Sequence, residues 1–246
     1  MGRFLGFLLF FLGLFISVAI ADWNILNLKT KNGLNMSLKN YCESWRMNVE
    51  LHNIQNFQVV PQECVSHIGK YVTSTQYQVD SERTIEECLV YLSTGCTLNK
   101  DGIDVWLFDI DDTLLSTVGE QLNLTSLEEW MRQGKAPVLE YSLKLFNELK
   151  SRGVQIILVS SRREHLRSAT IDNLVDVGYH GWTSLILRGP EDELDGVQKF
   201  KANVRKQLIG DGYRIWGILG DQYSSFEGLP SVKRTFKLPN PLYHVA

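Results

Sequence analysis

Short apolar runs alternate with amphipathic helical patterns after residue 100, and this alternation is the feature that most restricts the fold. Four runs are expected to be strands: Val105–Phe108, Val154–Val159, Leu185–Leu187 and Ile215–Leu219. Between strands, apolar residues recur at helical spacing from Leu139 to Leu149 and from Val197 to Leu208. Such alternation is typical of a parallel sheet, because parallel neighbours need a long crossover connection. We therefore predict an α/β fold, a Rossmann-like parallel sheet with helices on both faces.

Residues 22–99 show a different pattern and hold all four cysteines, which are Cys42, Cys64, Cys88 and Cys96. Helices are expected around Pro61–Ser74 and Glu82–Leu92. In a secreted chain, an even number of cysteines without CxxC spacing favours disulfides over zinc. Three pairings are possible, and we favour Cys42–Cys64 with Cys88–Cys96 because both loops are short and sequential. We predict a disulfide-tied, mainly helical N-terminal extension (22–99), packed on an α/β domain (100–246).

The first 21 residues are typical of a secretory signal peptide. Arg3 is their only charge, Phe4 to Val18 is almost continuously apolar, and Ala19-Ile20-Ala21 fits a small-x-small cleavage site. An uncleaved membrane anchor is the alternative, but about 15 apolar residues are fewer than the roughly 20 that span a bilayer as a helix. We predict cleavage of residues 1–21, no stable membrane insertion afterwards, and an extracellular or vacuolar destination.

Two sequons, at Asn35 and Asn123, gain weight from this secretory prediction. Each is interpreted as a glycosylation site, with an unmodified polar loop as the alternative.

Composition restricts the class of partner. The chain has 25 Lys+Arg and 28 Asp+Glu, a formal net charge of -3 and no long run of like charges. These values exclude an electrostatic surface for non-specific nucleic-acid binding. With 44% hydrophobic and 22% charged residues, the chain is an ordinary globular protein and neither disordered nor polytopic. We expect a small-molecule partner, and the sequence leaves a homodimer open.

Carboxylates follow the first and last of these apolar runs. The first run leads into Asp109-Ile110-Asp111-Asp112-Thr113, and the last into Gly220-Asp221. Ligands of open α/β sheets bind outside the carboxyl ends of the strands. Neighbouring carboxylates either repel or share a cation, and Mg²⁺ prefers oxygen ligands while keeping several waters. The pattern therefore predicts a magnesium site in which Asp221 joins the first motif.

Other chemistry-bearing residues are expected at the same edge. Ser160 follows the second run, and Lys201 begins the helix before the last run. A carboxylate can act as a nucleophile and form an aspartyl-phosphate, while an ammonium and a hydroxyl orient the phosphoryl group. Taken singly, these residues have plainer interpretations: an acidic turn or helix cap for the DxDxT motif, a solvated lysine, a turn aspartate and a helix N-cap serine. Their joint placement favours a phosphoryl-transfer site.

The sequence resembles the haloacid dehalogenase-like hydrolase superfamily and, more narrowly, the plant acid phosphatase and vegetative storage protein family of subfamily IIIB. The resemblance covers essentially the whole mature chain. The residues that carry it are Cys42-Glu43-Ser44-Trp45-Arg46, Phe108-Asp109-Ile110-Asp111-Asp112-Thr113-Leu114-Leu115-Ser116, Gly181-Trp182, Gly220-Asp221-Gln222 and Phe236-Lys237-Leu238-Pro239-Asn240-Pro241.

This resemblance implies a Mg²⁺-dependent acid phosphatase that hydrolyses phosphate monoesters through an aspartyl-phosphate. Matched by position, Asp109 is the nucleophile and Asp111 the general acid and base. Ser160 and Lys201 hold the phosphate. Mg²⁺ is bound by the Asp109 carboxylate, the Asp111 backbone carbonyl and Asp221. The acidic pH preference comes from the family alone.

Three departures from the family pattern bear on activity. Ser225 stands where relatives usually carry Asp, Ser161 replaces a usual Gly, and the segment between Ser116 and Glu129 is short. Loss of a carboxylate next to a metal site costs about 10–100-fold in affinity or activity. The alternatives are therefore a storage-type protein with weak or no phosphatase activity, or a module that binds phosphate or sugar phosphates. Arg162 and His165 follow Ser160 and have two interpretations, a substrate contact or a solvated first-turn residue, so both are left out of the catalytic set.

Overall fold

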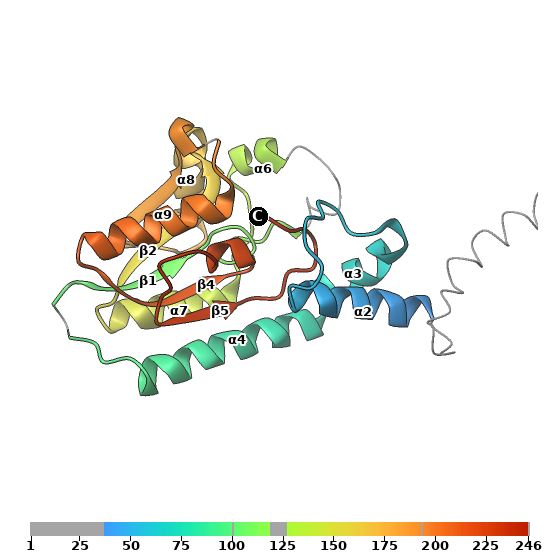
Figure 1. Ribbon diagram of the computed structural model, residues 1–246, viewed down its shortest axis with the longest axis horizontal. Helices are drawn as coiled ribbons and strands as arrows, with labels where there is room; N and C mark the ends of the chain where they lie inside the picture. The colour runs from blue at the N-terminus through green and yellow to red at the C-terminus, as the bar shows by residue number, and fades with distance from the viewer. Residues whose placement is uncertain (1–36, 100, 119–126, 193, 246) are drawn as a thin grey trace, which may run out of the picture.

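The computed structural model describes residues 37–99, 101–118, 127–192 and 194–245. Its centre is a five-stranded parallel sheet with the strand order β3-β2-β1-β4-β5 (Figure 1). The strands are β1 (Asp104–Phe108), β2 (Gln155–Arg163), β3 (Ser184–Arg188), β4 (Arg214–Gly220) and β5 (Arg234–Lys237). The parallel sheet and its four predicted strands are confirmed. The fifth, β5, was not predicted, because it is a four-residue edge strand with a mostly polar sequence.

Helices cover the sheet and build the N-terminal part of the chain. The α-helices are α2 (Leu38–Glu50), α3 (Val65–Val72), α4 (Thr75–Thr94), α6 (Leu127–Gln133), α7 (Glu140–Ser151), α8 (Arg167–Asp176) and α9 (Val197–Gly210). Short 3-10 helices are η1 (Gln62–Cys64), η2 (Glu164–Leu166), η3 (Pro190–Asp192) and η4 (Tyr223–Ser225).

Both faces of the sheet are buried. Trp106 and Phe108 of β1 lie in one core with buried side chains of α4, α7 and α8. Val105 and Leu107 alternate with them and lie in the other core, against α9. In Figure 1, α4 and α7 run below the sheet and α9 crosses in front of it. Burial of both faces explains why the strands are continuous apolar runs without polar alternation.

The N-terminal part forms a smaller core of its own. Cys42 of α2 and Cys64 of η1 form a disulfide, and both side chains are completely buried in that core. The same core includes Leu242, from the end of the described chain. The predicted helical extension and the Cys42–Cys64 pair are therefore confirmed.

The predicted pairing of Cys88 with Cys96 is wrong, because both are free thiols. Cys88 lies inside α4, which continues to Thr94. The six helical residues after Cys88 span roughly 9 Å at about 1.5 Å of rise per residue, and Cys96 lies beyond them. A disulfide requires Cα atoms within about 7 Å. Closeness in sequence misled the prediction, since a helix holds the two residues apart.

Some predictions fall on residues outside the described ranges. They are the signal peptide of residues 1–21, the sequons at Asn35 and Asn123, and most of the short segment after Ser116. The division of the chain at residue 100 also stays a prediction. Within the described ranges, no helix combines the length and the apolar character that crossing a membrane requires.

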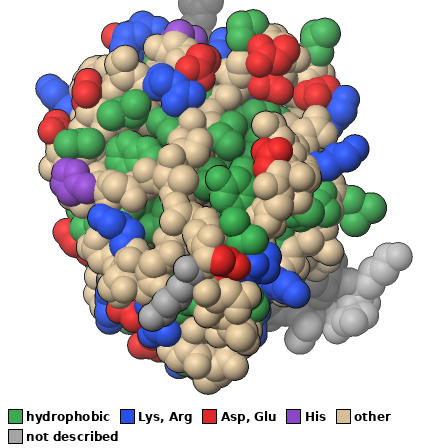
Figure 2. Space-filling model, turned by 90° about the vertical axis from the view of Figure 1, so that its left-hand side faces the viewer, with side chains coloured by type: hydrophobic (Ala, Val, Ile, Leu, Met, Phe, Trp, Pro, Cys, Tyr) green, Lys and Arg blue, Asp and Glu red, His purple; other side chains and the backbone are tan. Residues whose placement is uncertain are grey.

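Surface charges of both signs are interspersed on the side of the molecule that lies at the left of Figure 1. On that side, Lys and Arg alternate with Asp and Glu around the rim, and hydrophobic side chains lie among them (Figure 2). This pattern agrees with the near balance of 25 basic and 28 acidic residues in the chain.

Candidate active site

The sheet register brings the predicted strand-end residues to one edge. Phe108 pairs with Leu219, so β1 and β4 end side by side. The Asp109 N–H continues the ladder by donating to the Leu219 carbonyl at 3.0 Å. Asp109 and Asp221 therefore leave adjacent strands at the carboxyl edge, where the strand order changes direction and ligands of such sheets bind.

Asp109 lies in a compact polar contact with residues of α9 and η4. The Lys201 ammonium forms an ion pair with Asp109 Oδ2, and Ser225 Oγ lies 2.9 Å from the same oxygen. Lys201 Nζ also donates to Ser225 Oγ at 2.9 Å. Lys201 and Asp109 are 5% and 7% exposed, so the pair is screened little by water. Ser225, predicted only as a lost carboxylate, thus bridges the lysine and the aspartate.

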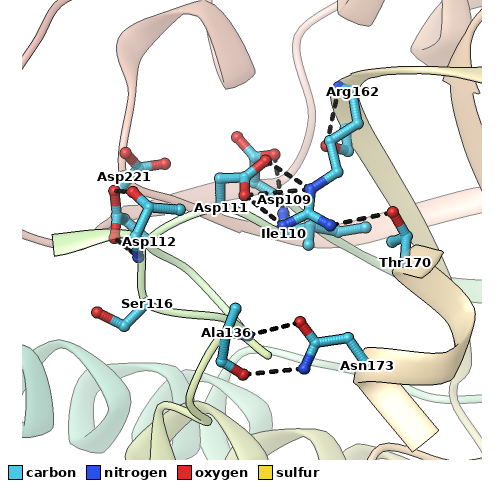
Figure 3. Close-up of polar contacts among 12 residues, drawn as sticks. Asp109, Ile110, Asp111, Asp112, Ser116, Ala136, Arg162, Thr170, Asn173 and Asp221 are labelled. Carbon is cyan, nitrogen blue, oxygen red and sulfur yellow. Dashed lines mark hydrogen bonds and ion pairs between the residues drawn. The ribbon is translucent and has the colours of Figure 1, made fainter. Parts of the chain in front are cut away.

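Asp111 is held by Arg162, which the sequence analysis left out. The Arg162 guanidinium donates from Nη2 to Asp111 Oδ1 at 2.7 Å and from Nε to both carboxylate oxygens (Figure 3). Its Nη1 donates to Thr170 Oγ1 at 3.0 Å. The interpretation of Arg162 as a solvated first-turn residue is therefore wrong, because its side chain is completely buried.

A bulge in β2 explains the orientation of Arg162. The β2–β3 pairing moves from Val159↔Ile186 to Arg163↔Arg188, so β2 advances four residues while β3 advances two. Bulges re-aim side chains next to active sites. Ser160 lies in this bulge rather than after the strand, and its buried Oγ accepts from the Arg162 N–H at 3.2 Å.

His165 is not brought into the site. Its ring contacts Glu128 of α6 at 2.8 Å, and its side chain is about half exposed.

Asp112 is a further buried carboxylate that was quoted in the motif but given no role. It has a positive φ of 48°, a conformation that aspartate tolerates better than most residues. Its Oδ1 accepts from the Thr117 N–H at 2.7 Å, and its Oδ2 from the Thr117 hydroxyl at 2.5 Å. Asp112 therefore closes the turn between Asp112 and Thr117.

The same turn is supported from the loop before α7. Ser116 N–H donates to the Pro137 carbonyl at 2.9 Å. The Ala136 N–H donates to Asn173 Oδ1 of α8 at 2.9 Å, and Asn173 Nδ2 donates to the Ala136 carbonyl at 2.9 Å (Figure 3). The turn is thus fixed by contacts that lie far apart in the sequence.

Asn240 and Tyr243 reach the site from the last described segment. Tyr243 OH lies 3.0 Å from Asp112 Oδ2 and 3.2 Å from Asp221 Oδ2. Asn240 Nδ2 donates to Asp221 Oδ2 at 2.6 Å. Asn240 belongs to the FKLPNP motif quoted above, but nothing in the sequence pattern ties it to the carboxylates.

Negative charge exceeds positive charge at this edge. Among the described residues, Asp109 and Asp111 contact the cations Lys201 and Arg162, whereas the hydrogen-bond partners of Asp112 and Asp221 are neutral donors. Burial raises the pKa of Asp221, and the charges of Asp109 and Asp112 raise it further. Burial also raises the pKa of Asp112. A bound cation would relieve this repulsion.

The oxygen donors at this edge fit Mg²⁺, which needs few protein ligands, better than they fit a metal ion that is held by side chains alone. Within the described ranges, no three His, Cys, Asp or Glu side chains cluster as metal ligands. Mg²⁺ needs only one or two carboxylates, because it keeps several waters and takes the remaining oxygens from substrate. Asp109 and Asp221, at adjacent strand ends, are two carboxylates that fit this requirement.

Residues 27–246 match the family described as HAD superfamily, subfamily IIIB (acid phosphatase). The chain belongs to this family. It is 35% identical over 213 residues to Acid phosphatase 1 of Solanum lycopersicum, a match that covers 83% of both chains. It is also 38% identical over 234 residues to Vegetative storage protein 1 of Arabidopsis thaliana, covering 90% of this chain and 85% of that one. The subfamily IIIB resemblance is therefore confirmed, and its members here carry both phosphatase and storage names.

A solved structure supports the fold. The class C acid phosphatase from Bacillus anthracis with tungstate bound superposes with a TM-score of 0.62 at 18% identity, covering 73% of this chain and 85% of that one. Because only 18% of the residues are identical, this comparison shows a shared fold, the parallel sheet with its helices, and nothing about function.

Proposed function

We propose that this subfamily IIIB protein is a Mg²⁺-dependent phosphomonoesterase of the secretory pathway that forms a phosphoenzyme on Asp109. The observation that carries the proposal is the arrangement of Asp109 against Lys201, with Asp111 and Asp221 at the same buried edge. Family membership supports the phosphatase class. The stem glycoprotein and vegetative storage names of relatives agree with an extracellular or vacuolar location.

In the proposed reaction, residues of this chain carry out two steps, formation of the phosphoenzyme and its hydrolysis. The Asp109 carboxylate attacks phosphorus and forms an acyl-phosphate bond, while the bond to the ester oxygen breaks. Asp111 gives its proton to the departing alkoxide, so the alcohol leaves neutral. Asp111 then takes a proton from the water that attacks the phosphoenzyme, which releases phosphate and restores Asp109. Ser160 and Lys201 hold the phosphoryl oxygens throughout.

The Asp109 carboxylate, the Asp111 backbone carbonyl and Asp221 would hold Mg²⁺. When bound, the ion neutralises negative charge on the phosphoryl oxygens. Lys201 adds positive charge beside Asp109, because its ammonium pairs with Asp109 Oδ2.

A storage-type role with weak catalysis is the second candidate. It is favoured by Ser225, a neutral residue at the position where the family usually has Asp, and by the similarity to vegetative storage proteins. In this role the fold and the phosphate site are kept while turnover is low.

Hydrolysis of a chromogenic aryl phosphate by the purified mature protein tests the proposal. We expect activity at acidic pH that EDTA removes and that Asp109→Asn abolishes without loss of folding. Asp195→Asn, on the loop before α9, is the matched control and should keep full activity. Wild-type turnover no higher than that of Asp109→Asn would overturn the phosphatase proposal. In that case, Mg²⁺-dependent phosphate binding would identify a binding module, and its absence would leave storage.

A further inference from the structure

The segment after β5 reaches the candidate metal site, although the sequence assigned none of its residues a role there. Leu238 N–H donates to the Gly220 carbonyl at 2.8 Å, which extends the β4–β5 ladder by one hydrogen bond. Gln222 then ties the chain further along, because its Nε2 donates to the Tyr243 carbonyl at 3.0 Å. The segment of residues 238–245 is therefore anchored to both sides of Asp221.

The orientation of the Asn240 amide follows from its hydrogen bonds. The Leu242 N–H donates to Asn240 Oδ1 at 2.9 Å, so Oδ1 faces the backbone. The amide nitrogen must then face the carboxylates, where it lies 2.6 Å from Asp221 Oδ2 and 3.4 Å from Asp112 Oδ2. Asn240 is 3% exposed, which leaves water little part in this contact.

The donors to Asp221 gather on one of its two oxygens. Oδ2 receives Asn240 Nδ2 at 2.6 Å, Tyr243 OH at 3.2 Å and Gln222 Nε2 at 3.2 Å. Among the described residues, Oδ1 has only the long 3.4 Å contact from the Thr113 hydroxyl. Asp221 itself is 1% exposed. The carboxylate is thus fixed by Oδ2, while Oδ1 keeps its capacity to bind a cation.

Tyr243 also connects Asp221 to Asp112. Its single hydroxyl proton is shared between two carboxylate oxygens at 3.0 and 3.2 Å. Without that hydroxyl, Asp112 and Asp221 would face each other across an unfilled polar gap, and each would lose a donor. Removing one donor from a buried charged acceptor is costly, since water does not replace it.

We propose that Asn240 and Tyr243 are positioning residues that hold Asp221 Oδ2, and so orient Oδ1 toward a divalent cation. The inference rests on the proposed function, because it takes Asp221 as a ligand of Mg²⁺. The positioning contacts act as outer-shell partners of a metal ligand, whose loss typically costs about 10–100-fold in metal affinity.

Calorimetric titration of the full mature protein with MgCl₂ tests this without using turnover. Tyr243→Phe removes the hydroxyl and keeps the ring, and Asn240→Ala removes the amide. We expect each variant to bind Mg²⁺ about 10-fold more weakly than wild type. The control Tyr213→Phe lies just before β4, at the opposite end from Asp221, and should bind as wild type does. Melting temperatures of all variants separate weaker binding from unfolding.

The dependence of kcat on Mg²⁺ concentration distinguishes a residue that positions the metal ligand from one that only stabilises the fold. In Tyr243→Phe, raising Mg²⁺ should restore kcat toward the wild-type value, while KM for the aryl phosphate stays within about two-fold. Wild-type Mg²⁺ affinity in both variants would overturn the positioning role and leave the phosphatase proposal standing. If wild type and Asp221→Asn titrate alike and wild-type activity survives EDTA, the Mg²⁺-dependent function fails, and the positioning role fails with it.

Discussion

The Arg162 guanidinium donates three hydrogen bonds to the Asp111 carboxylate. Nη2 lies 2.7 Å from Oδ1, and Nε lies 3.2 Å from Oδ1 and 3.1 Å from Oδ2. A guanidinium holds a carboxylate in a fixed plane, which an ammonium cannot do. The pair therefore fixes the orientation of the Asp111 carboxyl group, which the proposed reaction uses as general acid and base.

Arg162→Lys keeps the charge but loses the planar grip. We expect kcat for aryl phosphate hydrolysis to fall on the order of 10²-fold, since misplacement of a reacting group by about 1 Å has such an effect. Steady-state kinetics measure the change. Arg163→Lys, next in the strand and half exposed, is the control and should keep wild-type kcat. Equal losses in both variants would contradict an orienting role for Arg162.

Ser225→Asp tests whether the neutral residue limits catalysis. A carboxylate at 225 would pair with Lys201 and draw the ammonium from Asp109, which frees Asp109 for its proposed attack on phosphorus. The cavity bordered by Asp109, Lys201, Arg205 and Ser225 is only about 10 Å³, so the larger side chain must shift its neighbours. We expect kcat to rise about 10-fold, the lower end of the range for such contacts. Ser225→Ala is the matched variant without a polar atom, and it should be less active than wild type. A lower kcat in Ser225→Asp would mean that the serine bridge suits catalysis better.

The cysteines give a prediction that does not depend on activity. Alkylation of the unreduced, denatured protein should modify Cys88 and Cys96 and leave Cys42 and Cys64 joined. Peptide mass spectrometry measures both. Replacing Cys42 and Cys64 together by Ala should lower the free energy of unfolding by about 3 kcal/mol, from the lost constraint on a loop of about 20 residues. Cys96→Ser is the control, with a much smaller expected change. A recovered Cys88–Cys96 peptide would contradict the helical separation of these thiols.

The ring of His244 gives stability a pH dependence. It lies 3.4 Å from His52, Nε2 to Nε2, while Glu227 contacts His52 Nδ1 at 3.1 Å. Burial lowers the pKa of His244 below its ordinary 6.5, and His52 lowers it further against the opposing effect of Glu227. The folded state therefore binds fewer protons at this ring than the unfolded state. The contribution of neutral His244 to the stability of the folded state is therefore complete above pH 6.5 and is lost as the pH falls below 6.5.

We accordingly expect the melting temperature of wild type to fall between about pH 7 and pH 5, and to fall less in His244→Gln. Thermal unfolding at several pH values measures this difference. His180→Gln, at an exposed position, should follow the wild-type curve. A His244→Gln curve parallel to wild type would exclude this ring as a source of the pH dependence.

Much of the site was predictable because it obeys a rule about strand ends. Asp109, Asp111 and Asp221 follow apolar runs directly, so the parallel sheet alone brings them to one edge. Arg162 was missed because a bulge turns a residue that the pattern assigns to solvent into a buried partner of Asp111. Tyr243 was missed because its contacts with Asp112 span 131 residues of sequence, and no local periodicity carries that information. The predicted Cys88–Cys96 disulfide was wrong for the opposite reason. The two residues are close in sequence, but a helix lies between them and holds them apart in space.

The segment after β5 also links the two parts of the molecule. Leu238 is completely buried in the core beside the sheet, and Leu242, four residues later, is buried in the core of α2 and α3. Because only three residues separate Leu238 from Leu242, unfolding of either core would displace the residue that is buried in the other. We expect the extension and the sheet to melt as a single cooperative unit, with the slowest amide exchange shared between them.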